Sequence, residues 1–137
     1  MALFAEDFFN SVFLSTGFRF RKAIGYGTGV GGAVTQATNR TTGVTLNTVT
    51  GTITTNNASL AAEAAAEFTV TNSQVAANDV VVVSIQSGSN GGNTDIIVSA
   101  VAAGSFNLKV ANNNPAAGTA ETGAILINFA VIKGTAS

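Results

Sequence analysis

Hydrophobic and polar positions alternate with two different periods along the chain. Before Gly17 the apolar positions recur every three or four residues, which is typical of a short amphipathic helix. From Phe18 to Arg21 apolar and basic residues alternate strictly, as they do on a strand with one covered face. We therefore expect an N-terminal arm that consists of a short helix and an extended strand. The apolar helical positions are Ala5, Phe8, Phe9, Val12 and Phe13.

The rest of the chain has the pattern of an all-β domain. Short segments rich in Val, Thr and Ile are separated by turn residues, and their number and spacing predict an antiparallel β-sandwich or a jelly-roll-like domain. The continuous run at 80–85 predicts a strand covered on both faces. Residues 60–67 have helical composition, but we expect a loop or one helical turn there. The predicted strands are 44–46, 49–55, 68–72, 80–85, 96–101, 105–110 and 124–132, with a hairpin turn at 102–104.

These patterns divide the chain into three parts. Residues 1–24 are the predicted anchoring arm, which holds six of the nine phenylalanines. Residues 25–40 are a linker rich in Gly and Thr, and residues 41–137 are the predicted sandwich domain.

Composition excludes several classes of function. Charged residues make up 9% of the chain, against about 25% in ordinary globular proteins. The chain has no His and no Cys, which removes imidazole bases, thiol nucleophiles and the usual metal ligands. Six basic residues are too few for a nucleic-acid footprint, and the apolar runs are too short to span a membrane. The N-terminus also lacks the basic pattern of a signal peptide. We expect no catalytic residues, no metal and no cofactor.

Two motifs have a possible chemical reading and a simpler structural one. Residues 27–32 match G-x-G-x-x-G, but neither a buried strand before them nor a helix after them is predicted, so we favour an accidental match. The carboxylates of Glu63, Glu67, Asp79, Asp95 and Glu121 do not form a recognisable pair for acid–base chemistry. We interpret them as solvated groups at strand ends.

The phenylalanine-rich arm has two interpretations. It completes the core of its own domain, or it docks on a larger partner by hydrophobic burial and strand addition. The glycine-rich linker that follows favours docking, because it lets the arm leave the body. The C-terminal strand is apolar on both faces, which suits the core and also permits a subunit interface. The predicted partner-binding residues are Phe4, Phe8, Phe9, Phe13, Phe18, Arg19, Phe20, Arg21 and Lys22.

Several phrases of the body resemble a module found in virion structural proteins of tailed bacteriophages, including capsid decoration (cement) proteins. The resemblance covers residues 31–134, about three quarters of the chain. The phrases are Gly-Gly-Ala-Val-Thr-Gln at 31–36, Thr-Thr-Gly-Val-Thr-Leu-Asn at 41–47, Phe-Thr-Val-Thr-Asn-Ser at 68–73, Asp-Val-Val-Val-Val-Ser-Ile at 79–85, Val-Ala-Ala-Gly-Ser-Phe at 101–106 and Ile-Asn-Phe-Ala-Val-Ile-Lys-Gly at 127–134.

The resemblance implies a β-sandwich, often a homotrimer, that sits on the capsid surface and binds the major capsid protein. It also implies an N-terminal arm that extends across neighbouring capsid subunits. The expected function is therefore that of a capsid decoration protein. The alternative is the head-binding or receptor-binding module of a fibre or tail protein, and the length without a fibre repeat favours the first. An enzyme would need a carboxylate pair that the sequence does not provide.

Overall fold

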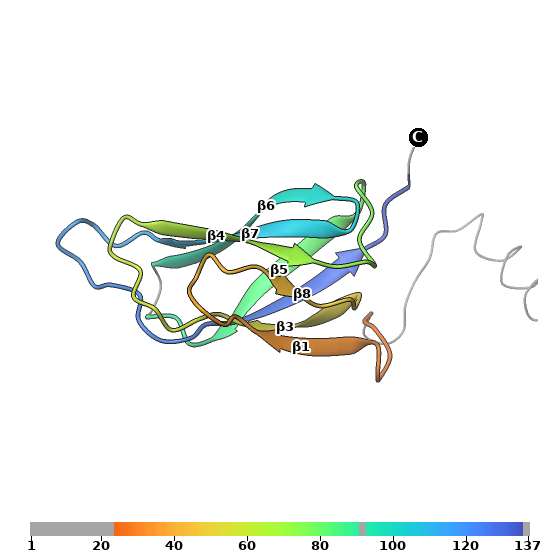
Figure 1. The fold of residues 1–137 in the computed structure, drawn as a ribbon, viewed down its shortest axis with the longest axis horizontal. Coiled ribbons are helices and arrows are strands. Elements are labelled where there is room, and N and C mark those ends of the chain that lie inside the picture. The colour runs from red at the N-terminus through yellow and green to blue at the C-terminus, as the bar shows by residue number, and fades with distance from the viewer. Residues whose placement is uncertain (1–23, 91–92, 136–137) are drawn as a thin grey trace, which may run out of the picture.

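The expected all-β class is confirmed. A computed structural model describes residues 24–90 and 93–135, and within these ranges the chain forms eight strands and no helix. The strands form two four-stranded sheets that face one another, as in a β-sandwich (Figure 1). The strands are β1 (Gly31–Thr35), β2 (Val44–Thr45), β3 (Thr50–Thr54), β4 (Ala65–Thr71), β5 (Val80–Ser87), β6 (Thr94–Ala102), β7 (Ser105–Asn112) and β8 (Leu126–Ile132).

The sheets are mixed, and the prediction of a wholly antiparallel sandwich is wrong. One sheet has the order β1-β3-β8-β5 and the other β2-β4-β7-β6. In each sheet the first pair is parallel, β1 with β3 and β2 with β4. From β1 to β6 each strand lies in the sheet opposite to the one before it, so β1 and β3 are joined through the other sheet. A crossover of this kind returns the chain in the same direction, whereas a hairpin would reverse it.

The hairpin between β6 and β7 is the local connection that the sequence predicts. Gly104 has a φ of 82°, in the left-handed region that a side chain disfavours. Its amide donates to the carbonyl of Val75 over 2.9 Å, and its carbonyl accepts from the amide of Asn72 over 2.8 Å. These two bonds attach the hairpin to the β4–β5 connection, so the turn is also part of the tertiary structure.

The core lies between the two sheets and follows the strand period of two. In β4 and β7 every second residue is buried, which places Phe68 and Leu108 inside the sandwich. Phe106 of β7 meets Phe129 of β8 across the interface, with ring centroids 5.4 Å apart and a tilt of 50°. The largest apolar core side chains are Phe68, Phe106, Phe129, Leu108, Ile53, Ile125 and Ile127.

Residues 60–67 contain no helix. Leu60 forms an isolated bridge with Glu121, a turn follows, and β4 already begins at Ala65. Glu63 has a φ of 61°, which interrupts the helical backbone that its composition favours. The expectation of a loop or turn therefore holds for residues 60–64, whereas residues 65–67 belong to β4.

Two other expectations change at the level of single strands. Residues 31–35 of the predicted linker form β1, which pairs with β3, so the sheet begins before residue 41. The run at 80–85 is not covered on both faces, because its side chains alternate between the core and the surface. The reason is that a sheet in a two-layer structure is covered by the other sheet on one face only, so the second face of β5 points to solvent. Of the predicted arm, only Ile24 belongs to the described residues.

Candidate docking surface

The residues predicted to contact a partner cannot be compared with the structure. Phe4, Phe8, Phe9, Phe13, Phe18, Arg19, Phe20, Arg21 and Lys22 all lie outside the described residues. The described chain begins two residues after Lys22, at Ile24. Residues 1–23 are therefore joined to the described structure at Ile24.

One end of an outer sheet face is apolar. Val80 pairs with Ile132 across the β5–β8 ladder, and Val82 pairs with Ala130 two residues further along. Residues two apart share one face of a strand, so these four side chains are neighbours. Val80 is 55% exposed, Val82 49% and Ile132 55%. We call Val80, Val82, Ala130 and Ile132 the outer-face patch.

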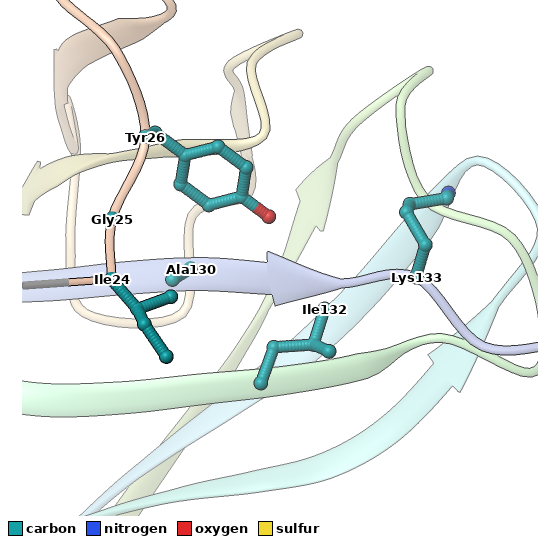
Figure 2. A pocket seen from close by; sticks show the side chains of 6 residues that line it. All are labelled: Ile24, Gly25, Tyr26, Ala130, Ile132 and Lys133. Carbon is teal, nitrogen blue, oxygen red and sulfur yellow. The ribbon is translucent and has the colours of Figure 1, made fainter. Parts of the chain in front are cut away.

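The first described residues run directly onto this patch. Figure 2 shows Ile24 and Tyr26 beside Ala130 and Ile132, where they line a pocket of about 430 Å³. Gly25 and Lys133 complete the lining. The Tyr26 hydroxyl donates to the carbonyl of Val131 in β8. This bond sets where the chain crosses the sheet, whereas Ile24 remains 75% exposed.

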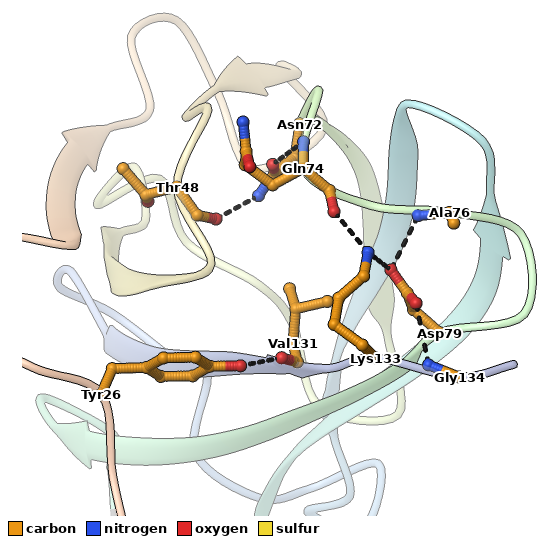
Figure 3. A network of polar contacts seen from close by, with 9 residues as sticks. All are labelled: Tyr26, Thr48, Asn72, Gln74, Ala76, Asp79, Val131, Lys133 and Gly134. Carbon is orange, nitrogen blue, oxygen red and sulfur yellow. Dashed lines mark hydrogen bonds and ion pairs between the residues drawn. The ribbon is translucent and has the colours of Figure 1, made fainter. Parts of the chain in front are cut away.

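A polar network at the end of β8 neutralises the charge next to the pocket. The Lys133 ammonium forms an ion pair with Asp79 and also donates to the carbonyl of Gln74 over 2.9 Å (Figure 3). Asp79 further accepts from the amides of Ala76 and Gly134, over 2.8 and 3.0 Å. The Ala76 amide, then the Lys133 ammonium and the Gly134 amide, lower the pKa of Asp79 to about 2. The ion pair therefore leaves the apolar surface beside it without an unpaired charge at Lys133.

A second polar cluster is buried where loops meet. Glu121 accepts from the Asn90 amide over 3.0 Å and from the Thr94 hydroxyl. The Arg40 guanidinium donates to the carbonyls of Gly123, over 2.7 Å, and Ala58. Burial lowers the pKa of Arg40, and the nearby charge of Glu121 partly offsets that effect. The donors and acceptors of both groups are used to hold loops together.

These contacts correct the interpretation of the carboxylates as solvated for two of the five, whereas Glu63, Glu67 and Asp95 are exposed. Asp79 and Glu121 are both buried, and each accepts hydrogen bonds from backbone amides of nearby loops. Within residues 24–90 and 93–135, no three His, Cys, Asp or Glu side chains lie close enough to hold a metal ion. The match at 27–32 leads into β1 and not into a helix, as expected for an accidental motif.

Sequence reasoning did not single out the outer-face patch. The signal was present in two places, the valine run at 80–83 and the both-face apolar C-terminal strand. Only the second was interpreted as a possible interface. A run of β-branched residues does not say which positions face outward, because this depends on whether one or two layers cover the strand.

Comparisons with known proteins do not assign this chain to a family. No family model matches it, and neither the curated proteins nor the solved structures compared with it include a match. In the part of the chain that the structure describes, no helical segment has the length and apolar character needed to cross a bilayer.

Proposed function

We propose that this protein is a capsid decoration (cement) protein of a tailed bacteriophage. It binds the outside of an assembled head and bridges neighbouring subunits of the major capsid protein. The observation that supports this best is the exposed apolar surface at Ile24, the residue to which the phenylalanine-rich residues 1–23 are joined. Apolar surface of this kind on a domain with few charges favours a role in binding.

The buried carboxylates support a structural role over a catalytic one. Asp79 binds two backbone amides and a lysine, and Glu121 binds an amide and a hydroxyl. A general acid or base needs a carboxylate that faces a substrate cleft. These two groups instead hold loops of the sandwich in place.

The proposed mechanism is multivalent attachment. The sandwich is a rigid, jelly-roll-like domain, and three copies form a homotrimer. Each copy has an arm that consists of a short helix and an extended strand, and this arm contacts the capsid. Each arm needs only modest affinity, because a trimer docks several arms at once. Since the bridged sites exist together only in the assembled shell, binding stabilises the shell by mass action.

Deletion of residues 1–22 tests the proposal. The truncated protein should keep its folded body and lose attachment to purified capsids in co-sedimentation. A full-length control with Ile97→Thr, an exposed position on the opposite sheet, should attach like the wild type. Unchanged attachment of the truncated protein would contradict the anchoring role of the arm.

The same assay separates the alternative function. A head-binding or receptor-binding module of a fibre or tail would not bind the capsid shell. It would bind another virion component, host cells or glycans. Binding of the full-length protein to host cells or glycans, with no binding to capsids, would reject the decoration proposal in favour of this module.

A further inference from the structure

The outer-face patch has a natural occupant in the chain itself. We infer that residues 18–23 of the same molecule cover Val80, Val82 and Ile132, with Phe18 and Phe20 facing the sheet. The inference deepens the proposed function, on which it rests for the role of the remaining arm. It assigns the base of the arm, with Phe18 and Phe20, to the sandwich, and so narrows the proposed capsid contact of the arm to Phe4, Phe8, Phe9 and Phe13.

The path of the described chain supports this occupant. Tyr26 is bonded to Val131, and Ile24 already lies over Ala130 and Ile132 (Figure 2). Neighbouring strands are about 4.8 Å apart, so Val80 and Val82 lie one strand beyond the point that Ile24 occupies. Phe20 is four residues before Ile24, and an extended chain lets it reach at most about 14 Å from there. The exposed valines lie within that radius.

The alternation of the arm gives the segment a suitable face. In an extended chain residues two apart point to the same side, so Phe18, Phe20, Ile24 and Tyr26 share one side. Ile24 and Tyr26 already line the pocket on the sheet. The phenylalanines therefore continue the face that contacts β8, while Arg19 and Arg21 point away to water.

Among residues 18, 20, 22, 24 and 26, which share this side, Lys22 is the one charged residue, and its long aliphatic stem can lie along the patch with the ammonium in water. The patch residues are all apolar, and the charge of Lys133 beside them is paired with Asp79. An apolar segment therefore meets no unpaired lysine there.

Covalent connection favours the molecule's own segment over a second copy. A tethered segment has an effective concentration in the millimolar range, far above that of a free partner in dilute solution. The molecule's own segment and a second copy of the chain would bury the same valines. The molecule's own segment has the higher effective concentration, so it covers the patch in the free protein.

Trypsin digestion of the free full-length protein tests the coverage. Arg19, Arg21 and Lys22 are cleavage sites inside the proposed segment. The double variant Val80→Thr/Val82→Thr keeps β-branched side chains but weakens the patch, and it should be cut at these sites severalfold faster than the wild type. The matched control is Ile97→Thr, which changes a 44% exposed isoleucine on the opposite sheet and should leave the rate unchanged. Equal rates in both variants would overturn the inference.

Engineered disulfides identify the occupant and do not depend on the threonine variant folding. The chain has no cysteine, so Phe20→Cys can be combined with Val80→Cys or Val82→Cys without a competing thiol. An intramolecular disulfide in either pair, above the level of Phe20→Cys with Ile97→Cys, supports the inference. A covalent dimer in place of the intramolecular disulfide would assign the patch to a second copy. If no disulfide forms, this segment does not cover the patch. Either result would reject the inference.

Both tests use the free protein, so they are independent of capsid binding. A protected arm base in a protein that does not attach to capsids would reject the proposed function and keep this inference. Capsid attachment by a protein whose residues 18–23 are unprotected would keep the proposed function and reject this inference.

Discussion

The two outer faces of the sandwich both carry a Thr–Asn pair across neighbouring strands, but only one of the faces has an apolar end. Each carries a cross-strand pair of neutral side chains, in which Thr52 donates to Asn128 on one face and Thr69 donates to Asn107 on the other, both over 3.0 Å. Next to its pair, the β4–β7 face continues with polar residues, because Asn107 also donates to Glu67 over 3.0 Å.

The β5–β8 face continues instead with valine, alanine and isoleucine at the outer-face patch. In a chain with 9% charged residues, Thr–Asn pairs supply the polarity that salt bridges supply elsewhere. Where these pairs stop, the surface becomes apolar, and Ile24 and Tyr26 lie against this end of the face. Position along the face, more than the identity of the sheet, therefore decides whether the surface is polar or apolar.

The largest expected effect tests whether the inner faces are alike although the outer ones differ. Phe129→Ala in β8 and Phe106→Ala in β7 each remove one ring of the central pair. Each should lower the free energy of unfolding by about 3–5 kcal/mol, because a large buried side chain is replaced by a cavity. Urea denaturation of the two variants measures this. A loss below about 1 kcal/mol in only one variant would show that the two sheets contribute unequally to the core.

The next effect tests the buried cluster that ties loops together away from both faces. Glu121→Ala leaves the amide of Asn90 and the hydroxyl of Thr94 without their acceptor. The expected loss is about 1–3 kcal/mol in free energy of unfolding, since the buried Thr94 hydroxyl keeps its desolvation cost when it has no partner. Glu67→Ala, at an exposed carboxylate of the β4–β7 face, is the control and should change stability by less than about 0.5 kcal/mol. Equal losses in both variants would contradict the structural role of Glu121.

A smaller effect sharpens the comparison of the two neutral pairs. Asn107→Ala and Asn128→Ala each break one cross-strand pair at an exposed or partly exposed site. Each should cost about 0.2–1 kcal/mol, with the larger loss at Asn107 because it also binds Glu67. Thermal unfolding of the two variants under one condition gives the ranking. A larger loss at Asn128 would reverse the comparison.

The last effect concerns the ion pair beside the patch, and its dependence on pH appears only in acid. The pKa of Asp79 is about 2 in the folded protein and 3.8 as its ordinary value, so the ionised group stabilises the fold above about pH 4. This contribution is lost as the pH falls from about 4 towards 2. Asp79→Asn lacks it at every pH, so the difference in unfolding midpoint from the wild type should be constant near neutrality and shrink below pH 4. A constant difference down to pH 2 would contradict the assignment.

Much of the fold could be predicted because strand formation is a local property. Alternation and β-branched composition predicted the strands near 105–110 and 124–132, and Gly104 predicted the hairpin before β7. The parallel pairs could not be predicted, because they arise when the chain crosses between sheets, and no residue pattern in β1 or β2 states which sheet it joins. The strand β1 was missed for a similar reason, since its glycines resemble a linker until β3 pairs with them.

The candidate site also has one part that the sequence predicts and one part that depends on tertiary structure. The periodicity of the first twenty residues predicts an amphipathic, phenylalanine-rich segment, since side-chain direction follows from the backbone period. The surface next to it depended on tertiary structure. Val80 and Val82 face water while Val81 faces the core because a second sheet covers only one side of β5. By itself, the sequence determined the all-β class and most of the strands. Only the packing of two layers decided which apolar residues remained outside, because burial depends on neighbours distant in the chain.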